Sequence, residues 1–163
     1  MSGHGAPAPE AFEVDHDLRV VIVASSWHEG VQQALVDNAV ATCQDYRIEA
    51  EVVWVPGAFE LPVVAARVAE ECDAVVALGT VIRGGTPHFE YVCQAVTQGL
   101  TTVALESGVP VGFGVLTCDD EGQALDRAGL PQSTENKGAE AAQAALATAT
   151  LLRRRATPRG LVV

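Results

Sequence analysis

The sequence predicts an α/β fold, a three-layer α/β/α sandwich around a parallel sheet, and three observations support this prediction. Short apolar runs that suit buried strands alternate with longer segments of helical spacing. Repeated alternation of this kind implies parallel strands joined by right-handed crossovers. Hydrophobic residues make up 48% of the 163 residues, but aromatic residues only 5%. The core must therefore be built from Val, Ala and Leu, as in sheets that helices cover on both faces.

The first part of the chain supplies a strand, a helix and a second strand. Leu18–Ser25 (LRVVIVAS) is a continuous apolar run with β-branched residues, which predicts a buried strand. Residues 28–43 carry apolar side chains on successive helical turns and predict an amphipathic helix. Ala50–Val55 (AEVVWV) predicts the second strand, which Pro and Gly end at once. We expect Trp54, inside this strand, to lie in the core.

The middle of the chain continues the alternation. Residues 59–71 repeat apolar side chains at helical period, and Pro62 is tolerable there because it falls in the first turn. Asp73–Ile82 (DAVVALGTVI) is the most apolar run and predicts the third strand. These two segments therefore predict a second crossover helix that leads into a central strand.

A third helix is predicted over residues 87–100, entered through two glycines. Thr86 suits its N-cap and Pro87 its first helical position. The stretch Thr101–Glu106 is ambiguous, since it fits either an extension of this helix or a short strand. The number of strands therefore stays open on the pattern alone.

The last part of the chain supplies one more strand and two helices. Val111–Thr117 (VGFGVLT) predicts a strand, and residues 120–128 and the Ala-rich 137–154 predict helices. Arg153–Arg155 suit the negative end of the last helix dipole.

The domain organisation is simple, because no internal repeat or linker divides the chain. We expect a flexible N-terminal arm over residues 1–16, rich in Gly, Ala and Pro, a single domain over 17–156, and a frayed tail over 157–163.

Composition and charge exclude several classes of function. The net charge of -11 argues against nucleic-acid binding, which needs a basic surface. No apolar run approaches the roughly 20 residues that span a membrane. Met1–Glu10 lacks the apolar core of a signal peptide. The cysteines have neither zinc-site nor disulfide-scaffold spacing, so we expect buried, reduced core thiols and a cytoplasmic protein. They are Cys43, Cys72, Cys93 and Cys118.

Polar and aromatic residues follow the first two predicted strands, at the sheet edge where ligands of parallel sheets bind. Trp27 follows the first strand and either stacks on a flat heterocycle or packs over the sheet end. Glu60 follows the second strand and either accepts hydrogen bonds from substrate hydroxyls or only stabilises a helix dipole. Both readings stay open on spacing alone.

The third strand leads into Gly84–Pro87, which predicts a phosphate cradle. Two glycines let the backbone approach a ligand, and the following helix start offers unpaired amides. An ordinary glycine turn is the alternative, since no dinucleotide or Walker fingerprint is present. His88 is either a proton-transfer residue beside this cradle or a surface residue. Arg127 and Lys137 are either partners of a phosphate or solvated charges.

Taken together, these segments resemble the lumazine synthase family. Their order and spacing cover nearly the whole chain after residue 17. The matching stretches are VVIVASSWHEG (20–30), PGAFELP (56–62), ALGTVIRGGTPHFEYV (77–92), GFGVLT (112–117), QALDRAG (123–129) and NKG (136–138).

The resemblance implies a flavodoxin-like fold with a four-stranded sheet, so 101–106 would end the third helix. It implies a homopentamer with active sites between subunits. The pyrimidine and ribityl chain of one substrate would meet Trp27, Ala58, Phe59, Glu60, Val81, Ile82, Phe113 and Lys137. A keto-phosphate would meet Gly84, Gly85, Thr86 and Arg127. Trp27 would stack on the ring, Phe113 would come from the adjacent subunit, and His88 would be the catalytic proton-transfer residue.

The implied reaction condenses 5-amino-6-(D-ribitylamino)uracil with 3,4-dihydroxy-2-butanone 4-phosphate to 6,7-dimethyl-8-ribityllumazine, in riboflavin biosynthesis, with no metal or redox cofactor. The resemblance leaves an association with riboflavin synthase open. The segment Leu130–Glu135 looks longer than the corresponding turn of capsid-forming members, which favours a free pentamer. Two other functions compete: an enzyme that dismutates lumazine to riboflavin, and a flavin-storage module.

Overall fold

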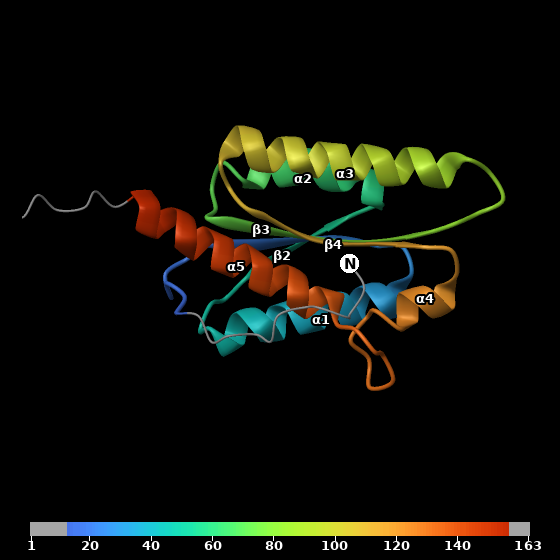
Figure 1. Cartoon of the computed structure of the whole chain (residues 1–163), viewed down its shortest axis with the longest axis horizontal. Coiled ribbons are helices and arrows are strands. Elements are labelled where there is room, and N and C mark those ends of the chain that lie inside the picture. The colour runs from blue at the N-terminus through green and yellow to red at the C-terminus, as the bar shows by residue number, and fades with distance from the viewer. Residues whose placement is uncertain (1–12, 157–163) are drawn as a thin grey trace, which may run out of the picture.

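The computed structural model describes residues 13–156 and has a four-stranded parallel sheet between two layers of helices (Figure 1). The strands are β1 (Val20–Ser25), β2 (Glu51–Val55), β3 (Ala74–Ile82) and β4 (Val111–Cys118). The helices are α1 (Glu29–Asp45), the 3₁₀ helix η1 (Ala58–Glu60), α2 (Leu61–Val68), α3 (His88–Ser107), α4 (Glu121–Leu125) and α5 (Lys137–Ala156). The predicted fold class is confirmed.

The strand order β2-β1-β3-β4 makes β1 and β3 central and leaves β2 and β4 at the edges. Helices α2 and α3 cover one face of the sheet, and α1, α4 and α5 cover the other (Figure 1). Ile22 and Leu78 are buried toward the α1 side, and Val23 and Val75 toward the α2 side. This continuous Val, Ala and Leu burial is what a parallel sheet between two helical layers requires.

The strands do not all extend equally far at the carboxyl edge of the sheet. β3 pairs with β1 as far as Leu78, which lies opposite Ala24. It pairs with β4 four residues further, as far as Ile82 opposite Cys118. The loops after β3 and β4 therefore begin beyond the loop after β1.

The structure shows where α3 ends, which the sequence pattern left open, and where it begins, which the pattern predicted differently. Residues 101–106 belong to α3, as the resemblance implied, and Val103 is buried there. The Thr86 cap, however, was predicted wrongly: Pro87 is the N-cap, and no N-cap side chain accepts a hydrogen bond from the amides of the first turn. The backbone of Pro87 already accepts the first bond, from the amide of Glu90, so the helix begins one residue later than expected.

The core position expected for Trp54 is also wrong. Its side chain is 46% exposed. The reason is its place in the sheet, because β2 is an edge strand and is exposed or half-buried along most of its length. An apolar run predicts a strand, but it does not say whether neighbours cover both faces.

Residues 13–16, which we expected in the N-terminal arm, lie against the domain. Val14 is buried in the core cluster, and Asp15 pairs with Arg153 of α5 at 3.7 Å. Asp17 pairs with the same guanidinium at 2.6 Å. The rest of the predicted arm, residues 1–12, and the predicted tail, 157–163, lie outside the described residues.

Gly138 lets α5 begin directly against the backbone of α1. A Cβ at this position would lie 2.2 Å from the carbonyl oxygen of Leu35, an atom that cannot move without α1. We therefore expect Gly138→Ala to lower the free energy of unfolding by about 2 kcal/mol, because the two helices must separate. Denaturant unfolding measures this change.

The matched control is Gly30→Ala, also in a helix, where a Cβ would meet nothing within 4 Å. It should leave the free energy of unfolding within about 0.5 kcal/mol of its original value. Equal stability of the two variants would contradict the close approach at Gly138.

Candidate active site

The ends of β1 and β2 bring Trp27 and Glu60 together. A Cβ built on Gly57 would lie 3.0 Å from Oε2 of Glu60 and 3.7 Å from Nε1 of Trp27, so both side chains lie over a bare glycine. The hydroxyl of Ser26 donates to the carbonyl of Val55 at 2.9 Å and ties the two strand exits together. Trp27 is 67% exposed, so it does not pack over the sheet end. An exposed indole beside a carboxylate suits a flat ring that carries hydroxyl groups.

The residue that follows Trp27 has an unusual backbone conformation. His28 is the N-cap of α1 and has a left-handed backbone, with φ 60° and ψ 59°. Its carbonyl accepts the amide of Gln32 at 2.9 Å, which fixes the start of the helix. A non-glycine residue in this conformation costs about 1 kcal/mol and is often found at functional sites. Sequence reasoning missed this feature, because a backbone angle leaves no pattern in the sequence.

The segment Ala58–Glu60 forms η1 and lies on the sheet because β3 makes room for it. A Cβ on Gly79 would lie 2.9 Å from the Leu61 side chain and 3.5 Å from Cβ of Ala58. Ala58 is buried, whereas Phe59 is 62% exposed. The phenyl ring is therefore available to a ligand at the same edge as Trp27.

The loop between β3 and α3 exposes the residues predicted to cradle a phosphate. Gly84, Gly85, Thr86 and His88 are all exposed, and a Cβ on either glycine would meet nothing within 4 Å. His88 is the first residue of α3. Val81 and Ile82, the last residues of β3, are half-buried just before the loop. Backbone amides, a hydroxyl and an imidazole are thus close in the chain and open to solvent.

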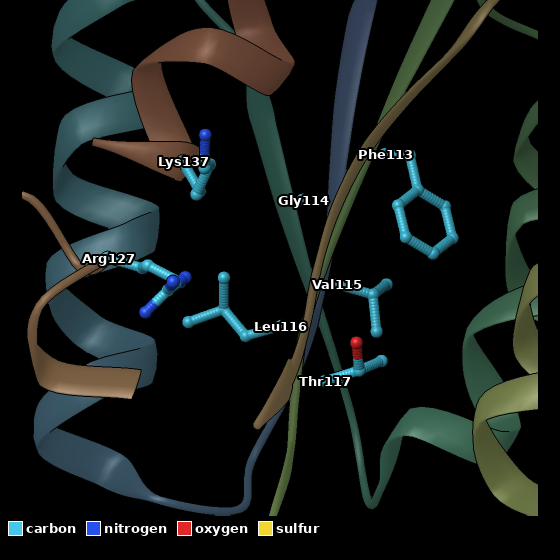
Figure 2. Close-up of a pocket in the computed structure, with 7 residues that line it drawn as sticks. All are labelled: Phe113, Gly114, Val115, Leu116, Thr117, Arg127 and Lys137. Carbon is cyan, nitrogen blue, oxygen red and sulfur yellow. The ribbon is translucent and has the colours of Figure 1, made fainter. Parts of the chain in front are cut away.

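A hollow of about 380 Å³ lies along the edge strand β4 (Figure 2). Figure 2 shows Phe113, Val115 and Thr117 on one side of the strand. Arg127, Leu116 and Lys137 lie on the other side. The lining residues are Phe113, Gly114, Val115, Leu116, Thr117, Arg127 and Lys137. An apolar ring and two cations therefore share one strand edge.

Glu135 organises the two cations of this hollow. Nη2 of Arg127 lies 3.7 Å from one oxygen of Glu135, and Nζ of Lys137 pairs with the other. Nη1 of Arg127 donates to the carbonyl of Gln123 at 2.9 Å. Burial alone would lower the pKa of Lys137, but hydrogen bonds to Glu135 and Glu140 raise it above its ordinary value. Sequence reasoning did not single out Glu135, because an acid near a lysine is an ordinary surface pattern.

The chain does not gather all the predicted site residues into one cavity. The strand order separates the exits of β1 and β4 by β3, which is roughly 10 Å at the usual strand spacing. Arg127 lies on the α1 and α5 face of the sheet, whereas the loop after β3 leads to α3 on the opposite face (Figures 1 and 2). Neither Trp27 nor His88 lines the hollow along β4.

Other reactive groups in the described part of the chain do not form a site. The four cysteines are free thiols, and Cys43, Cys72 and Cys118 are buried as expected, whereas Cys93 in α3 is only half-buried. Burial raises the pKa of Cys43 to about 11, which makes it a poor nucleophile. Among residues 13–156, no His, Cys, Asp and Glu side chains cluster in a way that suits a metal ion. None of the helices in this range has the length and hydrophobicity to cross a membrane.

Comparison with known proteins gives a consistent result. Residues 17–153 match the family model described as 6,7-dimethyl-8-ribityllumazine synthase. The chain is 60% identical over 158 residues to the 6,7-dimethyl-8-ribityllumazine synthase of Pseudarthrobacter chlorophenolicus, covering 94% of this chain and 98% of that protein. It is 59% identical over 155 residues to the protein of the same name from Streptomyces coelicolor, covering 94% and 96%.

Proposed function

The chain belongs to the 6,7-dimethyl-8-ribityllumazine synthase family, and on this basis we propose which residues perform its reaction and how copies of the chain complete the site. It is an enzyme of riboflavin biosynthesis, a transferase that makes 6,7-dimethyl-8-ribityllumazine. Family membership favours this activity over lumazine dismutation and over flavin storage.

We propose that each active site lies between two copies of the chain in a homopentamer. One observation carries this proposal: the hollow with Phe113, Arg127 and Lys137 lies apart from the Trp27–Glu60 pair. Within the described residues β4 is an edge strand, so its outer side is open to a neighbour. If the hollow of a neighbouring copy lay over the ends of β1, β2 and β3, it would face the Trp27–Glu60 pair and the two groups of residues would form one site. A repeated head-to-tail contact of this kind closes into a ring of five when each copy is rotated by a fifth of a turn from the last.

The pyrimidine substrate would bind at the exits of β1, β2 and β3. Trp27 stacks on the heterocycle, and Phe113 of the adjacent copy covers its other side. Glu60 accepts hydrogen bonds from the ribityl hydroxyls, beside Ala58 and Phe59. The backbone of Val81 and Ile82 holds the ring edge. The exposure of Trp27 and its closeness to Glu60 support these roles.

The keto-phosphate would bind at the loop after β3. The amides of Gly84 and Gly85 and the hydroxyl of Thr86 hold the phosphate, and Arg127 of the adjacent copy supplies a forked donor. Lys137 supports this arrangement through Glu135. Together these groups hold the ketone against the amine, and such positioning supplies much of the catalysis.

His88 would move the protons of the condensation. The 5-amino group attacks the ketone, and the carbinolamine loses water to give an imine. Loss of the proton on the carbon next to the imine then expels phosphate and leaves an enol, which takes up a proton on its terminal carbon to become a ketone. The ribityl-bearing nitrogen attacks this ketone and closes the ring with loss of a second water. Each step moves a proton at nitrogen, oxygen or, in the elimination and the tautomerisation, carbon, and an exposed imidazole beside the phosphate loop is able to exchange these protons.

An assay with each substrate omitted in turn tests the function. Lumazine absorbance should rise only when the ribitylamino-pyrimidine and the keto-phosphate are both present. Riboflavin formed from lumazine alone would show the dismutating activity instead. Yellow protein that retains flavin but forms no lumazine would show a storage function.

We propose a free pentamer rather than a larger shell. The loop between α4 and α5 projects from the domain (Figure 1). It is held by bonds from Thr134 to Asp126, at 3.1 Å from the amide and 2.8 Å from the hydroxyl, so it is an ordered projection. Such a projection is expected to hinder close packing of one pentamer on another. Light scattering should give the mass of a pentamer of 17.0 kDa subunits, and a particle many times heavier would contradict this.

The cysteine thiols indicate the cellular compartment in which the enzyme works. Cys43, Cys72, Cys93 and Cys118 are free, which suits a reducing compartment. We therefore propose that the enzyme works in the cytoplasm.

A further inference from the structure

Arg83 connects both ends of the glycine loop to the rest of the domain. Its amide donates to the carbonyl of Cys118 at 2.9 Å, and its Nε donates to Oδ1 of Asp119 at 2.7 Å. Its Nη1 pairs with Glu90 in the first turn of α3. Its guanidinium carbon lies 4.2 Å from the centre of the Phe89 ring. The residue just before the loop thus holds β4 on one side and the start of α3 on the other.

Packing does not set the shape of the loop that Arg83 spans. Gly84, Gly85, Thr86 and Pro87 are all exposed, and nothing lies within 4 Å of a Cβ at either glycine. Two adjacent glycines have wide backbone freedom, so holding the loop in one conformation costs conformational entropy. The contacts of Arg83 with Phe89 and Glu90 close this segment, so they restrict where the loop amides and His88 lie.

The guanidinium of Arg83 is hydrogen-bonded to carboxylates, whereas the carboxylates near Arg127 lie 3.7 Å and 4.0 Å from it, so Arg127 is the better phosphate partner. The Arg83 guanidinium already faces two carboxylates, Asp119 and Glu90. The hydrogen bond from Arg83 lowers the pKa of Glu90, and bonds to Asp119 and Glu90 raise the pKa of Arg83. Arg83 and Glu90 therefore stay charged at neutral pH. A network that also includes an aromatic ring orders its side chains better than an isolated surface pair.

We propose that Arg83 is a positioning residue that holds the Gly84–Thr86 loop and His88 in place for the keto-phosphate, which rests on the function proposed above. Its role is selective, because the loop touches one substrate and not the other. Loss of Arg83 should therefore impair keto-phosphate binding and leave the pyrimidine site of Trp27 and Glu60 as it was.

Steady-state kinetics of Arg83→Gln test this proposal. The KM for the keto-phosphate should rise about tenfold, since two ion pairs and a ring contact are lost. The KM for the ribitylamino-pyrimidine should stay unchanged. Arg83→Lys should recover part of the loss, because a single ammonium keeps charge but cannot donate to both carboxylates from a planar fork.

Arg67→Gln is the matched control. Arg67 also pairs with two exposed carboxylates, Glu70 and Glu71, but it lies in α2 near the amino end of β3. This variant should keep both KM values. A keto-phosphate KM that is the same in Arg83→Gln and Arg67→Gln would overturn the proposal.

Amide hydrogen exchange separates this inference from the proposed function. Peptides that span residues 84–88 should exchange faster in Arg83→Gln than in the original enzyme or in Arg67→Gln, without any substrate. Faster exchange in a protein that makes no lumazine would support loop positioning and reject the function. Normal exchange and normal KM values in an active enzyme would reject the positioning role. If Arg83→Gln does not fold, Asp119→Asn keeps Arg83 and should raise loop exchange by a smaller amount, and unchanged exchange there would overturn the proposal.

Discussion

Replacing His88 by alanine is expected to lower kcat about a hundredfold without abolishing turnover. The imidazole is exposed at the start of α3, beside the loop that would hold the phosphate. It would carry protons between the amine, the carbinolamine and the departing water, whereas positioning of the two substrates does not depend on it. Both KM values should therefore change little. Steady-state kinetics over a range of pH measure the effect.

His16→Ala is a suitable control for this experiment. The ring of His16 lies 3.0 Å from the carbonyl of Tyr46, beyond the carboxyl end of α1. That is the opposite edge of the sheet from His88, so kcat should stay the same. An equal kcat for His88→Ala and the original enzyme would show that another group moves the protons.

Replacing Arg127 by alanine is expected to raise the KM for the keto-phosphate about a hundredfold, because the anion loses a charged, forked donor. The side chain is 35% exposed in the hollow along β4, which is open to a ligand. The KM for the pyrimidine should change little. Arg127→Lys keeps the charge and loses the forked geometry of the donors. Its KM for the keto-phosphate should therefore lie between the values of the original enzyme and of Arg127→Ala. An unchanged keto-phosphate KM in Arg127→Ala would remove Arg127 from the site.

Mixing these two impaired variants, assayed at a keto-phosphate concentration well below the raised KM, tests whether His88 and Arg127 meet across a subunit boundary. His88→Ala and Arg127→Ala chains are dissociated, combined in equal amounts and reassembled. If each site takes His88 from one copy and Arg127 from the next, about a quarter of the sites regain both residues. No recovery of activity in assembled mixtures would mean that each copy carries a complete site.

Most of the fold was predictable, because strands and helices leave local periodic patterns. The runs that became β1 and β3 are apolar on both faces, which only a strand between two helical layers allows. Helix ends were less certain, since the start of α3 depends on which backbone carbonyl accepts the first bond. The exposure of Trp54 was missed because edge and central strands have similar sequences.

The sequence by itself determined which residues with suitable chemistry follow the strands. An aromatic residue, a pair of glycines and a histidine stand directly after strands, and in a parallel sheet these exits share one edge. Tertiary structure alone decided which of these groups belong together in one copy. It placed Trp27 beside Glu60 and put Arg127 in a separate hollow on the edge strand. Strand order and the ion pairs of Arg83 and Glu135 join residues far apart in the chain, so no local pattern records them.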